Sequence, residues 1–504
     1  MRLSLIPRSV RGLFTIVLVF LGLSALTILP LYTTLLHESR EAPAVQTGQG
    51  TPPPNLLLIY TDDQRWDTMC LELDAAGYTG PCEHADGPPM PFMRDLMLMT
   101  ETVVFTNAFV SYPLCCPSRV SLLKGGRYAH QTGIMGNSPP QGGALAFSTV
   151  DTPTIASQLQ LSPTNYATAL IGGKYVNHYA EQQVDFAQGT AYVPPGWGYF
   201  AVTADIVYGE EHGDTFGVVV AEEGVVEQVE YLTQTRLLDW ERAQAQAFIE
   251  TICPGDCEGN PSQPFFLLYS TYAPHISARF KLPISYTQQF YTDYAYAGRA
   301  WNEDNPDDGE TASDKPFNVA FEADEFENDP LRQEEVKEYA RRQLQMLQWL
   351  DDNLEQFIGT LEAKGLLENT IILFTSDNGM LWGEHGLAHK NKPYEEALRV
   401  PLFIYNPLDM WPDEVITELV AVDLDLAPTL LDLADAAPLP SDGRSLVELV
   451  QGVGGPWRSA FLIQGNYDLY RATANHPQAW VGLRTADCKV VWTITGEREL
   501  YPYT

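Results

Sequence analysis

Two short acidic segments carry the side chains with the clearest chemical potential. Asp62 and Asp63 stand in "YTDDQ", and Asp377 and Asn378 stand in "SDNG", each pair directly after an apolar run. All four offer oxygen atoms, and ligand sets made only of oxygen select a hard cation such as Ca²⁺ or Mg²⁺ over zinc. Either segment alone is also typical of a turn, because Asp and Asn bond readily to nearby backbone. Together they predict one divalent-metal site, provided that the fold brings them together.

Two adjacent cysteines form the second candidate. Cys115 and Cys116 precede Pro-Ser-Arg in "LCCPSRVSLLKGGRY". The residues alone leave three interpretations open: a reactive position, a buried pair of thiols, and a vicinal disulfide.

Apolar strands must position these side chains. "NLLLIYTDD" and "TIILFTSDNG" each pass from the pattern of a buried strand directly into carboxylates. "YATALIGGKY" and "PFFLLYSTYAPH" follow the same pattern and end in glycine or polar residues. Because ligands of open α/β sheets gather beyond the carboxyl ends of the strands, we expect all four strand ends to meet at one edge.

Helical spacing completes an α/β pattern. Residues 331–364 form the longest helix candidate, and Gly365 suits its C-cap. The apolar face of this helix comprises Leu344, Leu347, Leu350, Leu354 and Ile358. Short strand-like runs follow from about Ser459 and suggest a small antiparallel sheet. We predict a large mixed, mostly parallel sheet sandwiched by helices in a catalytic domain over 55–440, with a small C-terminal subdomain over 441–504.

The N-terminal segment indicates export. Arg2, Arg8 and Arg11 precede the uncharged stretch 12–36. This stretch is longer than the apolar core of a signal peptide, about 7–15 residues, which favours a membrane anchor with its N-terminus inside over a cleaved signal. Both interpretations place the catalytic part outside the cytoplasm, behind a linker over 37–54. The anchored form would touch the membrane only through the N-terminal segment, and the cleaved form would be secreted or periplasmic.

The net charge limits the possible partners, and the cysteines are compatible with export from the cytoplasm. The chain has 30 basic and 65 acidic residues, a net charge of −35, which disfavours nucleic acid and anionic membranes as partners. An anionic substrate therefore requires a local positive site. Export permits disulfides, and Cys253–Cys257 and Cys70–Cys82 are plausible local pairs.

Taken together, the motifs resemble those of the sulfatase family. "CCPSRVSLLKGGRY" is similar to the family's C-x-P-S-R signature. "YTDDQ", "GGKY", "APH", "SDNG" and "KNKPYEEALRVPL" come in the order that the family shows, and the similarity runs from about Asn55 to the end of the chain.

The resemblance implies that Cys115 is a precursor rather than the working group. In sulfatases the first cysteine of the signature is oxidised during export to the aldehyde formylglycine by a formylglycine-generating enzyme, while Cys116 fills the variable position. A hydrated aldehyde carries two hydroxyls on one carbon. One attacks sulfur and releases the alcohol; the other then loses a proton, and collapse to the aldehyde expels sulfate. A serine would be left as a stable sulfate ester.

The resemblance also implies one divalent metal, usually Ca²⁺, with Mg²⁺ as the alternative. It would acidify the attacking hydroxyl and hold the sulfate oxygens. The implied ligands are Asp62, Asp63, Asp377, Asn378 and the modified Cys115.

Four further positions match basic residues of the family. Arg119 is expected to steady the hydrated aldehyde. Lys174 and Lys390 are expected to grip the sulfate and stabilise transition-state charge, although a solvated surface lysine is the ordinary alternative. His275 is our candidate for a sulfate contact and for the acid that protonates the leaving oxygen, with a structural histidine as the alternative.

Some positions depart from the common family pattern. Val176 stands where many sulfatases have a histidine, two residues after the lysine of "GGKYVNHY". This segment resembles the branch of N-acetylglucosamine-6-sulfatases and heparan endosulfatases, in which an asparagine lies three residues after that lysine. Asn177 is therefore expected to contact the aldehyde hydrate or the substrate. His178 has no assigned role, and His385 either lines the entrance or shapes its loop.

Two other departures concern local structure. "LLKGGRY" replaces the common Thr-Gly-Arg run with Lys124 and an added glycine. The chain ends at "ELYPYT", where relatives usually continue through an acidic turn into another helix, so we expect a truncated subdomain with one sheet face poorly covered.

The motifs favour an exported sulfatase that acts on a sulfated small molecule or glycan. A sugar sulfate is favoured over an aryl sulfate, and the negative net charge favours short substrates attacked at their ends. One alternative is a phosphodiesterase or phosphonate monoester hydrolase on the same fold. The other is a non-catalytic, membrane-tethered glycan-binding protein.

Overall fold

The computed structural model describes residues 52–70, 84–207, 215–257, 259, 261–275, 281–293, 329–408, 410–411, 415–466, 479–494 and 496–502. The predicted anchor or signal at 1–36 lies outside these residues, as does the linker up to residue 51. Among the described residues, no helix combines the length and the apolar composition that crossing a bilayer requires.

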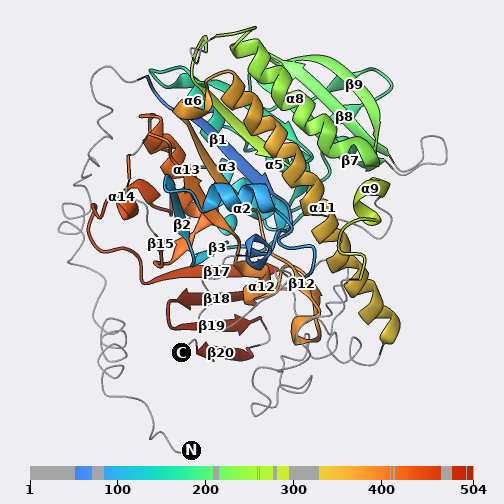
Figure 1. The fold of residues 1–504 in the computed structure, drawn as a ribbon. Helices are drawn as coiled ribbons and strands as arrows, with labels where there is room; N and C mark the ends of the chain where they lie inside the picture. Colours follow the sequence, from blue (N-terminus) through green and yellow to red (C-terminus); the bar gives the residue numbers. More distant parts are fainter. Residues whose placement is uncertain are drawn as a thin grey trace, which may run out of the picture. The chain divides into compact units, whose positions relative to one another are not determined.

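A ten-stranded mixed sheet organises the fold (Figure 1). Its parallel centre runs, in spatial order, through β11 (Thr370–Ser376), β1 (Asn55–Thr61), β10 (Phe265–Ser270), β4 (Ala167–Gly172) and β7 (Tyr199–Val207). Beyond β11 lie β14 (Leu402–Tyr405), β2 (Thr102–Phe105) and β15 (Val415–Ile416); beyond β7 lie β8 (Thr215–Glu222) and β9 (Val225–Thr233). The predicted fold class, a large mixed sheet covered by helices, is confirmed.

Helices cover both faces of the sheet, and the side chains of β1 are therefore buried on both sides. Leu57 and Ile59 pack toward α2 (Pro91–Met97), α8 (Leu237–Ile252) and α11 (Pro330–Ala363), which lie in front of the sheet in Figure 1. Leu56 and Leu58 pack toward the other layer. That layer contains α3 (Cys115–Leu123), α5 (Gly143–Ser148), α6 (Ile155–Leu161), α13 (Val422–Leu433) and α14 (Leu446–Val450).

Short elements fill the connections. The helical ones are η1 (Trp66–Met69), α4 (Ala129–Thr132), α7 (Tyr179–Gln183), η3 (Gln234–Arg236), α9 (Ile284–Thr287), η5 (Leu367–Asn369), η6 (Glu384–Gly386) and α12 (Glu395–Leu398). Three two-stranded pairs join β3 (Ala108–Phe109) to β16 (Val420–Ala421), β5 (Val184–Asp185) to β6 (Thr190–Ala191), and β12 (Leu381–Trp382) to β13 (Ala388–His389).

The long helix predicted over 331–364 is confirmed as α11. Its first turn is capped by Asp329, whose carboxylate accepts hydrogen bonds from the backbone of Leu331 and Arg332. The five residues of its predicted apolar face are all buried. Gly365 follows the C-cap with a positive φ of 68°, which a residue without a Cβ adopts readily.

The C-terminal antiparallel sheet is also confirmed. It consists of β17 (Ala460–Asn466), β18 (Ala479–Thr485), β19 (Cys488–Thr493) and β20 (Arg498–Pro502). One face packs against the main body through Phe461, Ile463, Trp480 and Val491. The other face carries exposed apolar side chains, namely Val481, Leu483, Trp492 and Leu500.

One apolar segment is divided between two strands. The sequence "VVFTNAFV" reads as continuous, yet β2 and β3 belong to different sheets. Between them, the Thr106 hydroxyl and the Asn107 amide donate to the carbonyls of Ile416 and Thr417. These two polar side chains turn the strand where its apolar pattern is interrupted.

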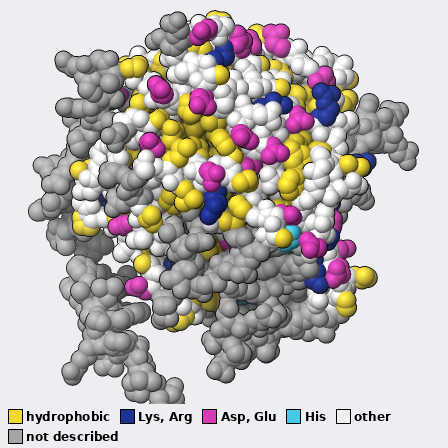
Figure 2. All heavy atoms as spheres, viewed as in Figure 1, with side chains coloured by type: hydrophobic (Ala, Val, Ile, Leu, Met, Phe, Trp, Pro, Cys, Tyr) yellow, Lys and Arg dark blue, Asp and Glu magenta, His cyan; other side chains and the backbone are white. Residues whose placement is uncertain are grey.

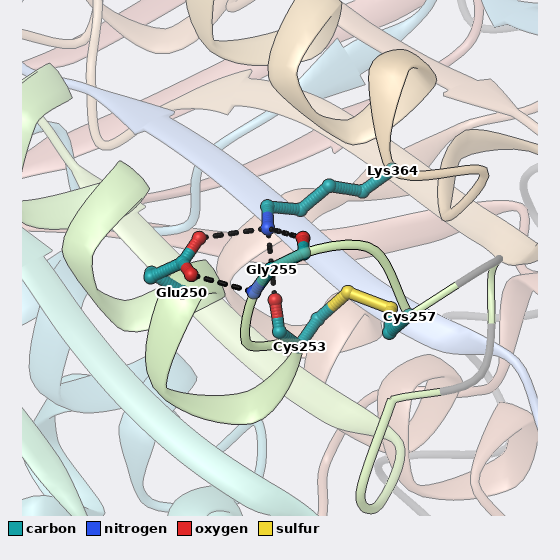
Figure 3. Close-up of a disulfide and its surroundings, with 5 residues drawn as sticks. All are labelled: Glu250, Cys253, Gly255, Cys257 and Lys364. Atoms are coloured by element: carbon teal, nitrogen blue, oxygen red, sulfur yellow. Dashed lines mark hydrogen bonds and ion pairs between the residues drawn. A yellow bond between two sulfur atoms is a disulfide. The ribbon is translucent and has the colours of Figure 1, made fainter.

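The predicted disulfide Cys253–Cys257 is confirmed at the end of α8 (Figure 3). Lys364 holds its loop, donating to the Glu250 carboxylate at 2.7 Å and to the carbonyls of Cys253 and Gly255 at 2.8 and 2.6 Å. Cys70 is disulfide-bonded, and the predicted partner Cys82 lies outside the described residues.

Acidic side chains are scattered over the surface, as expected from the net charge of −35. Figure 2 shows them interspersed with apolar side chains on one face of the molecule. No basic patch for a polyanion is visible among the described residues of this face.

The added glycine after α3 is required by close packing. Gly125 and Gly126 have φ values of 93° and 83°, and a Cβ at Gly126 would lie only 1.9 Å from the Leu424 carbonyl oxygen of α13. Lys124 just before them donates to the carbonyls of Val150 and Pro153. The glycine that departs from the common motif therefore allows α3 and α13 to pack closely at this point.

We predict that Gly126→Ala destabilises the protein by about 3 kcal/mol or more, since the new methyl group forces the backbones of α3 and α13 apart. Gly133 is the matched control: its φ is 80°, and no atom lies within 4 Å of its added Cβ. Gly133→Ala should cost only about 1 kcal/mol, from backbone conformation alone. Urea unfolding measures both, and equal losses would contradict the packing explanation.

Candidate active site

The register of β1 and β11 brings the two acidic segments together. Thr61 lies opposite Ser376, so the residues that follow both strands become neighbours. The backbone N–H of Asp63 donates to Asp377 Oδ1 at 3.2 Å, and Asn378 Nδ2 donates to Asp63 Oδ1 at 2.6 Å. Both acidic segments are almost completely buried.

Cys115 lies beside these carboxylates as the first residue of α3. Its sulfur is 3.4 Å from Asp62 Oδ1 and 2.7 Å from the Lys390 ammonium. Potential ligand atoms of Asp62, Asp63, Cys115 and Asp377 all lie within 4.8 Å of one another.

Arg119, one turn along α3, connects the two acidic segments. Its Nε donates to Asp377 Oδ2 at 2.7 Å, and its Nη2 lies 3.2 Å from Asp62 Oδ2. Its remaining nitrogen donates to the Ser270 hydroxyl at 2.6 Å, and the guanidinium lies over the Tyr60 ring. The side chain is only 2% exposed.

Both candidate lysines enter the same cluster. Lys174, two residues after β4, places its ammonium 2.6 Å from Asp62 Oδ2. Lys390, just after β13, hydrogen bonds to Asp63 Oδ1 as well as to Cys115. They are 3% and 13% exposed, so neither is an ordinary surface lysine.

His275 forms the more exposed margin of the cluster. Its Nε2 lies 3.8 Å from Asp63 Oδ2, and its ring contacts the edge of Tyr272. Burial and the nearby Lys174 ammonium lower the pKa of His275 well below its ordinary value. The imidazole is therefore neutral before a substrate anion arrives.

Buried charges of both signs determine the protonation of the carboxylates. Burial alone would raise the pKa of Asp62, but Lys174 and the other nearby cations hold it well below its usual range. For Asp63, burial outweighs the Lys390 ammonium and raises the pKa to about 6. Both carboxylates are ionised at neutral pH.

The donor set fits a hard cation. Asp63 Oδ2 and Asn378 Oδ1 are buried and have no hydrogen-bond partner. A buried acceptor without a partner is costly, and a bound cation would satisfy both oxygens. The carboxylates of Asp62 and Asp377 complete a set of oxygen ligands of the kind that Ca²⁺ and Mg²⁺ prefer.

Asn177 and His178 follow Lys174 in the chain, between β4 and α7. The Asn177 carbonyl accepts from the Ala144 backbone at 2.9 Å, whereas its side-chain Oδ1 is buried without a hydrogen-bond partner. His178 shares a 3.0 Å hydrogen bond with the Ser138 hydroxyl. These contacts give His178 a structural role and leave a polar atom of Asn177 available.

His385 is held within its own loop. Its Nε2 is 3.4 Å from Glu396 Oε2, and its ring stacks on Tyr394 with 4.4 Å between centroids. These contacts support the loop-shaping alternative. Cys115 and Cys116 are both free thiols, so the structure contains no vicinal disulfide between them.

Sequence patterns did not identify Glu241. This fully buried residue of α8 accepts a hydrogen bond from the Tyr272 backbone through Oε1 at 3.2 Å, while its Oε2 is buried without a hydrogen-bond partner. It thereby holds the segment that carries His275 against α8. In the sequence, Glu241 could have been recognised only as a charged residue on the apolar face of an amphipathic helix.

Comparison with known proteins agrees with this arrangement. The family model described as Sulfatase matches residues 54–436. The chain belongs to the sulfatase family. A second model, described as N-sulphoglucosamine sulphohydrolase, C-terminal, matches residues 383–502 of this sulfatase. The predicted family and the predicted enzyme class, sulfuric ester hydrolase, are thereby confirmed.

Two relatives illustrate the branch. The sulfatase is 27% identical over 432 residues to human N-acetylglucosamine-6-sulfatase, covering 82% of this chain and 68% of that protein. It is 28% identical over 439 residues to a putative extracellular sulfatase Sulf-1 homolog of Caenorhabditis elegans, covering 81% of this chain. The match spans 52% of that longer protein.

Solved structures share the fold. One protein, in complex with its substrate D-glucosamine-2-N,6-O-disulfate, matches with a TM-score of 0.62 and 24% identity, covering 89% of this chain and 91% of its own. The phosphonate monoester hydrolase of Silicibacter pomeroyi matches with a TM-score of 0.64 and 19% identity, covering 89% of both chains. At these identities the comparison concerns the fold alone.

We predict that Glu241→Gln removes part of the pH dependence of stability. Burial raises the pKa of Glu241 to about 8, so the folded protein retains a proton that the unfolded chain releases at its ordinary, lower pKa. The wild type should therefore lose stability as pH rises from about 5 to 8, and the glutamine variant should lose less.

Urea unfolding at several pH values measures this difference. Glutamine retains an acceptor for the Tyr272 N–H. Glu355→Gln is the control, because Glu355 is an exposed glutamate of α11. Parallel pH curves for the wild type and Glu241→Gln would show that Glu241 is not protonated in the fold.

Proposed function

We propose that this sulfatase hydrolyses a sulfate monoester of a sugar, with a 6-sulfated glucosamine as the favoured class. The observation that carries the proposal is the position of Cys115 against Asp62 and Lys390, at 3.4 and 2.7 Å, in a buried cluster of both charges. The sugar class is supported by the name of the human relative and by Asn177 in "GKYVN". Short substrates are favoured, because the acidic surface repels an extended polyanion.

Residue 115 is proposed to act as formylglycine, produced by a formylglycine-generating enzyme during export. When present, the hydrated aldehyde supplies a hydroxyl that attacks sulfur. Lys390, 2.7 Å from the sulfur of the unmodified residue, is suited to stabilise negative charge on that hydroxyl. Arg119 fixes the adjacent carboxylates and the first turn of α3.

The substrate sulfate requires positive charge and a proton. Lys174 is proposed to contact its oxygens, with the adjoining Asp62 holding the ammonium in place. His275 is proposed to bind the sulfate and to protonate the leaving oxygen. The arriving anion would raise the pKa of His275 from its lowered value, which makes the imidazole a better proton carrier once substrate is bound.

One divalent cation, Ca²⁺ with Mg²⁺ as the alternative, is proposed to be held by the oxygen set. The holding residues would be Asp62, Asp63, Asp377, Asn378 and the modified residue 115. When bound, the cation supplies positive charge that favours ionisation of the hydroxyl and binding of sulfate. The unpartnered Asp63 Oδ2 and Asn378 Oδ1 support this assignment.

Asn177 is proposed to contact the substrate or the aldehyde hydrate through its unpartnered Oδ1. His385 is proposed to shape the entrance rather than to touch the sugar, given its contacts with Glu396 and Tyr394. The enzyme is proposed to work outside the cytoplasm, anchored or released. The disulfide Cys253–Cys257 and the apolar segment 12–36 support this location.

We predict that the enzyme, produced with a formylglycine-generating enzyme, releases sulfate from N-acetylglucosamine-6-sulfate and turns over the matched 6-phosphate much more slowly. Cys115→Ala should lower kcat/KM by about 10³-fold or more, because the nucleophile is lost. Cys116→Ala is the matched control. Peptide mass analysis should find an aldehyde at position 115 in the wild type and this control. Faster phosphate turnover, or full activity of Cys115→Ala, would reject the proposal.

We predict that Ca²⁺ stabilises the apo-enzyme against thermal unfolding, by about 2.7 kcal/mol at 100 times its dissociation constant. Asp63→Asn should greatly reduce this shift, because it removes a charged ligand. Asp185→Asn, at an exposed position, should retain it. Calorimetry after chelation and Ca²⁺ or Zn²⁺ addition measures the effect without substrate. An equal shift in both variants, or a larger one with Zn²⁺, would contradict the proposed ligand set.

A further inference from the structure

The loop that carries Lys390 lies between the active site and the C-terminal sheet. The backbone N–H of Asn391, the next residue, donates to the Pro113 carbonyl at 2.8 Å. Pro113 is two residues before Cys115, so this bond ties the Lys390 loop to the segment that enters α3. The left-handed φ of 65° at Asn391 sets the direction of the chain at this point.

A tryptophan of the C-terminal sheet holds the other side of Asn391. Trp480 Nε1 of β18 donates to the Asn391 carbonyl at 3.2 Å. Both of these bonds use the backbone of Asn391, and the indole is the side chain that joins this backbone to the sheet. Its ring is 3% exposed, and a buried indole N–H normally requires an acceptor.

Gly465 makes room for this ring. It lies opposite Trp480 in the pairing of β17 with β18, and a Cβ on it would be 2.3 Å from Trp480 Cε2. The indole therefore lies directly over the glycine backbone. This close contact fixes the direction in which Nε1 points.

The same sheet holds the Cys115 segment at a second point. The backbone N–H of Gln464, next to Gly465, donates to the Ser111 carbonyl at 2.9 Å. Ser111 is fixed from the main domain by Asp423, whose carboxylate accepts from its backbone and hydroxyl at 2.8 and 2.7 Å. Two adjacent residues of β17 thus support the site: Gln464 bonds to the segment before Cys115, and Gly465 positions the tryptophan that bonds to the Lys390 loop.

Further along the Lys390 loop, the sheet provides ionic contacts. Arg484 of β18 and Lys489 of β19 lie 3.1 and 3.3 Å from the Glu395 carboxylate. The loop is therefore attached to the C-terminal sheet on both sides of Lys392. The bond from Trp480 is the one closest in sequence to Lys390.

We propose that Trp480 is a positioning residue of the sulfatase reaction: through Asn391, its indole N–H sets the placement of the Lys390 ammonium against residue 115. The C-terminal sheet is then part of the catalytic machinery. This inference rests on the proposed roles of residue 115 and Lys390. It also explains why a tryptophan and a glycine face each other at this point of the sheet.

Trp480→Phe tests the inference, because it retains an aromatic ring and removes the donor. The expected result is a kcat lower by about 5- to 30-fold with KM changed less than twofold, since alignment of the reacting groups is lost while sulfate contacts remain. Trp492→Phe is the matched control: Trp492 belongs to the same sheet but is exposed on its opposite face. Rates are divided by the fraction of aldehyde at residue 115.

Hydrogen exchange provides a measurement that does not need substrate. The peptide containing Asn391 should exchange faster in Trp480→Phe than in Trp492→Phe, at equal global stability. If the phenylalanine variant folds poorly, Trp480→Leu replaces it, because leucine also lacks a hydrogen-bond donor, and the same loss is expected.

Equal kcat and equal exchange in the Trp480 and Trp492 variants would overturn the inference. A wild type that releases no sulfate would instead reject the proposed function, and the exchange data would still decide whether Trp480 holds Asn391.

Discussion

The structure depends on burying three carboxylates at the end of a parallel sheet. Asp62, Asp63 and Asp377 are completely or almost completely removed from water, where an unpaired charge is very costly. Arg119, Lys174 and Lys390 offset that cost through direct ion pairs. The compensation by protein groups is incomplete, because oxygens of Asp63 and Asn378 have no hydrogen-bond partner. A site with balanced charges and unused oxygen ligands is suited to bind a metal cation first and then an anionic substrate.

The sheet makes this concentration of charge possible. β1, β10 and β11 run parallel and in register, so the residues after each strand meet at one edge. Helix α3 then directs Cys115 and Arg119 into the same place, and its position depends on tight contacts such as that of Gly126 with α13. The geometry of the site is therefore a property of the core packing, and small displacements between layers would separate Cys115 from its charged neighbours.

The strands and the helix that local sequence patterns encode could be predicted. Apolar runs ending in polar residues indicated β1, β4, β10 and β11, and periodic leucines indicated α11. The partners that hold the site could not be predicted. Trp480 is 89 residues from Asn391, and Glu241 lies in an ordinary amphipathic helix, in a different segment of the chain from the Tyr272 backbone that it contacts. Such contacts depend on which elements become neighbours, information that spacing within one segment does not contain. The division of β2 from β3 could not be predicted for the same reason, since the Thr106 and Asn107 side chains bond to the distant carbonyls of Ile416 and Thr417.

The overall charge and the local charge of this enzyme oppose each other. A net charge of −35 repels sulfated substrates at long range, but that repulsion is screened beyond about 8 Å at physiological ionic strength. Within the site, the three carboxylates and three basic groups cancel, so a bound divalent cation would leave a positive centre for one sulfate group. A short sugar needs only this centre, whereas a long polyanion must also cross the acidic surface. Selection for substrate length would therefore arise from the surface, independently of the chemistry proposed for residue 115.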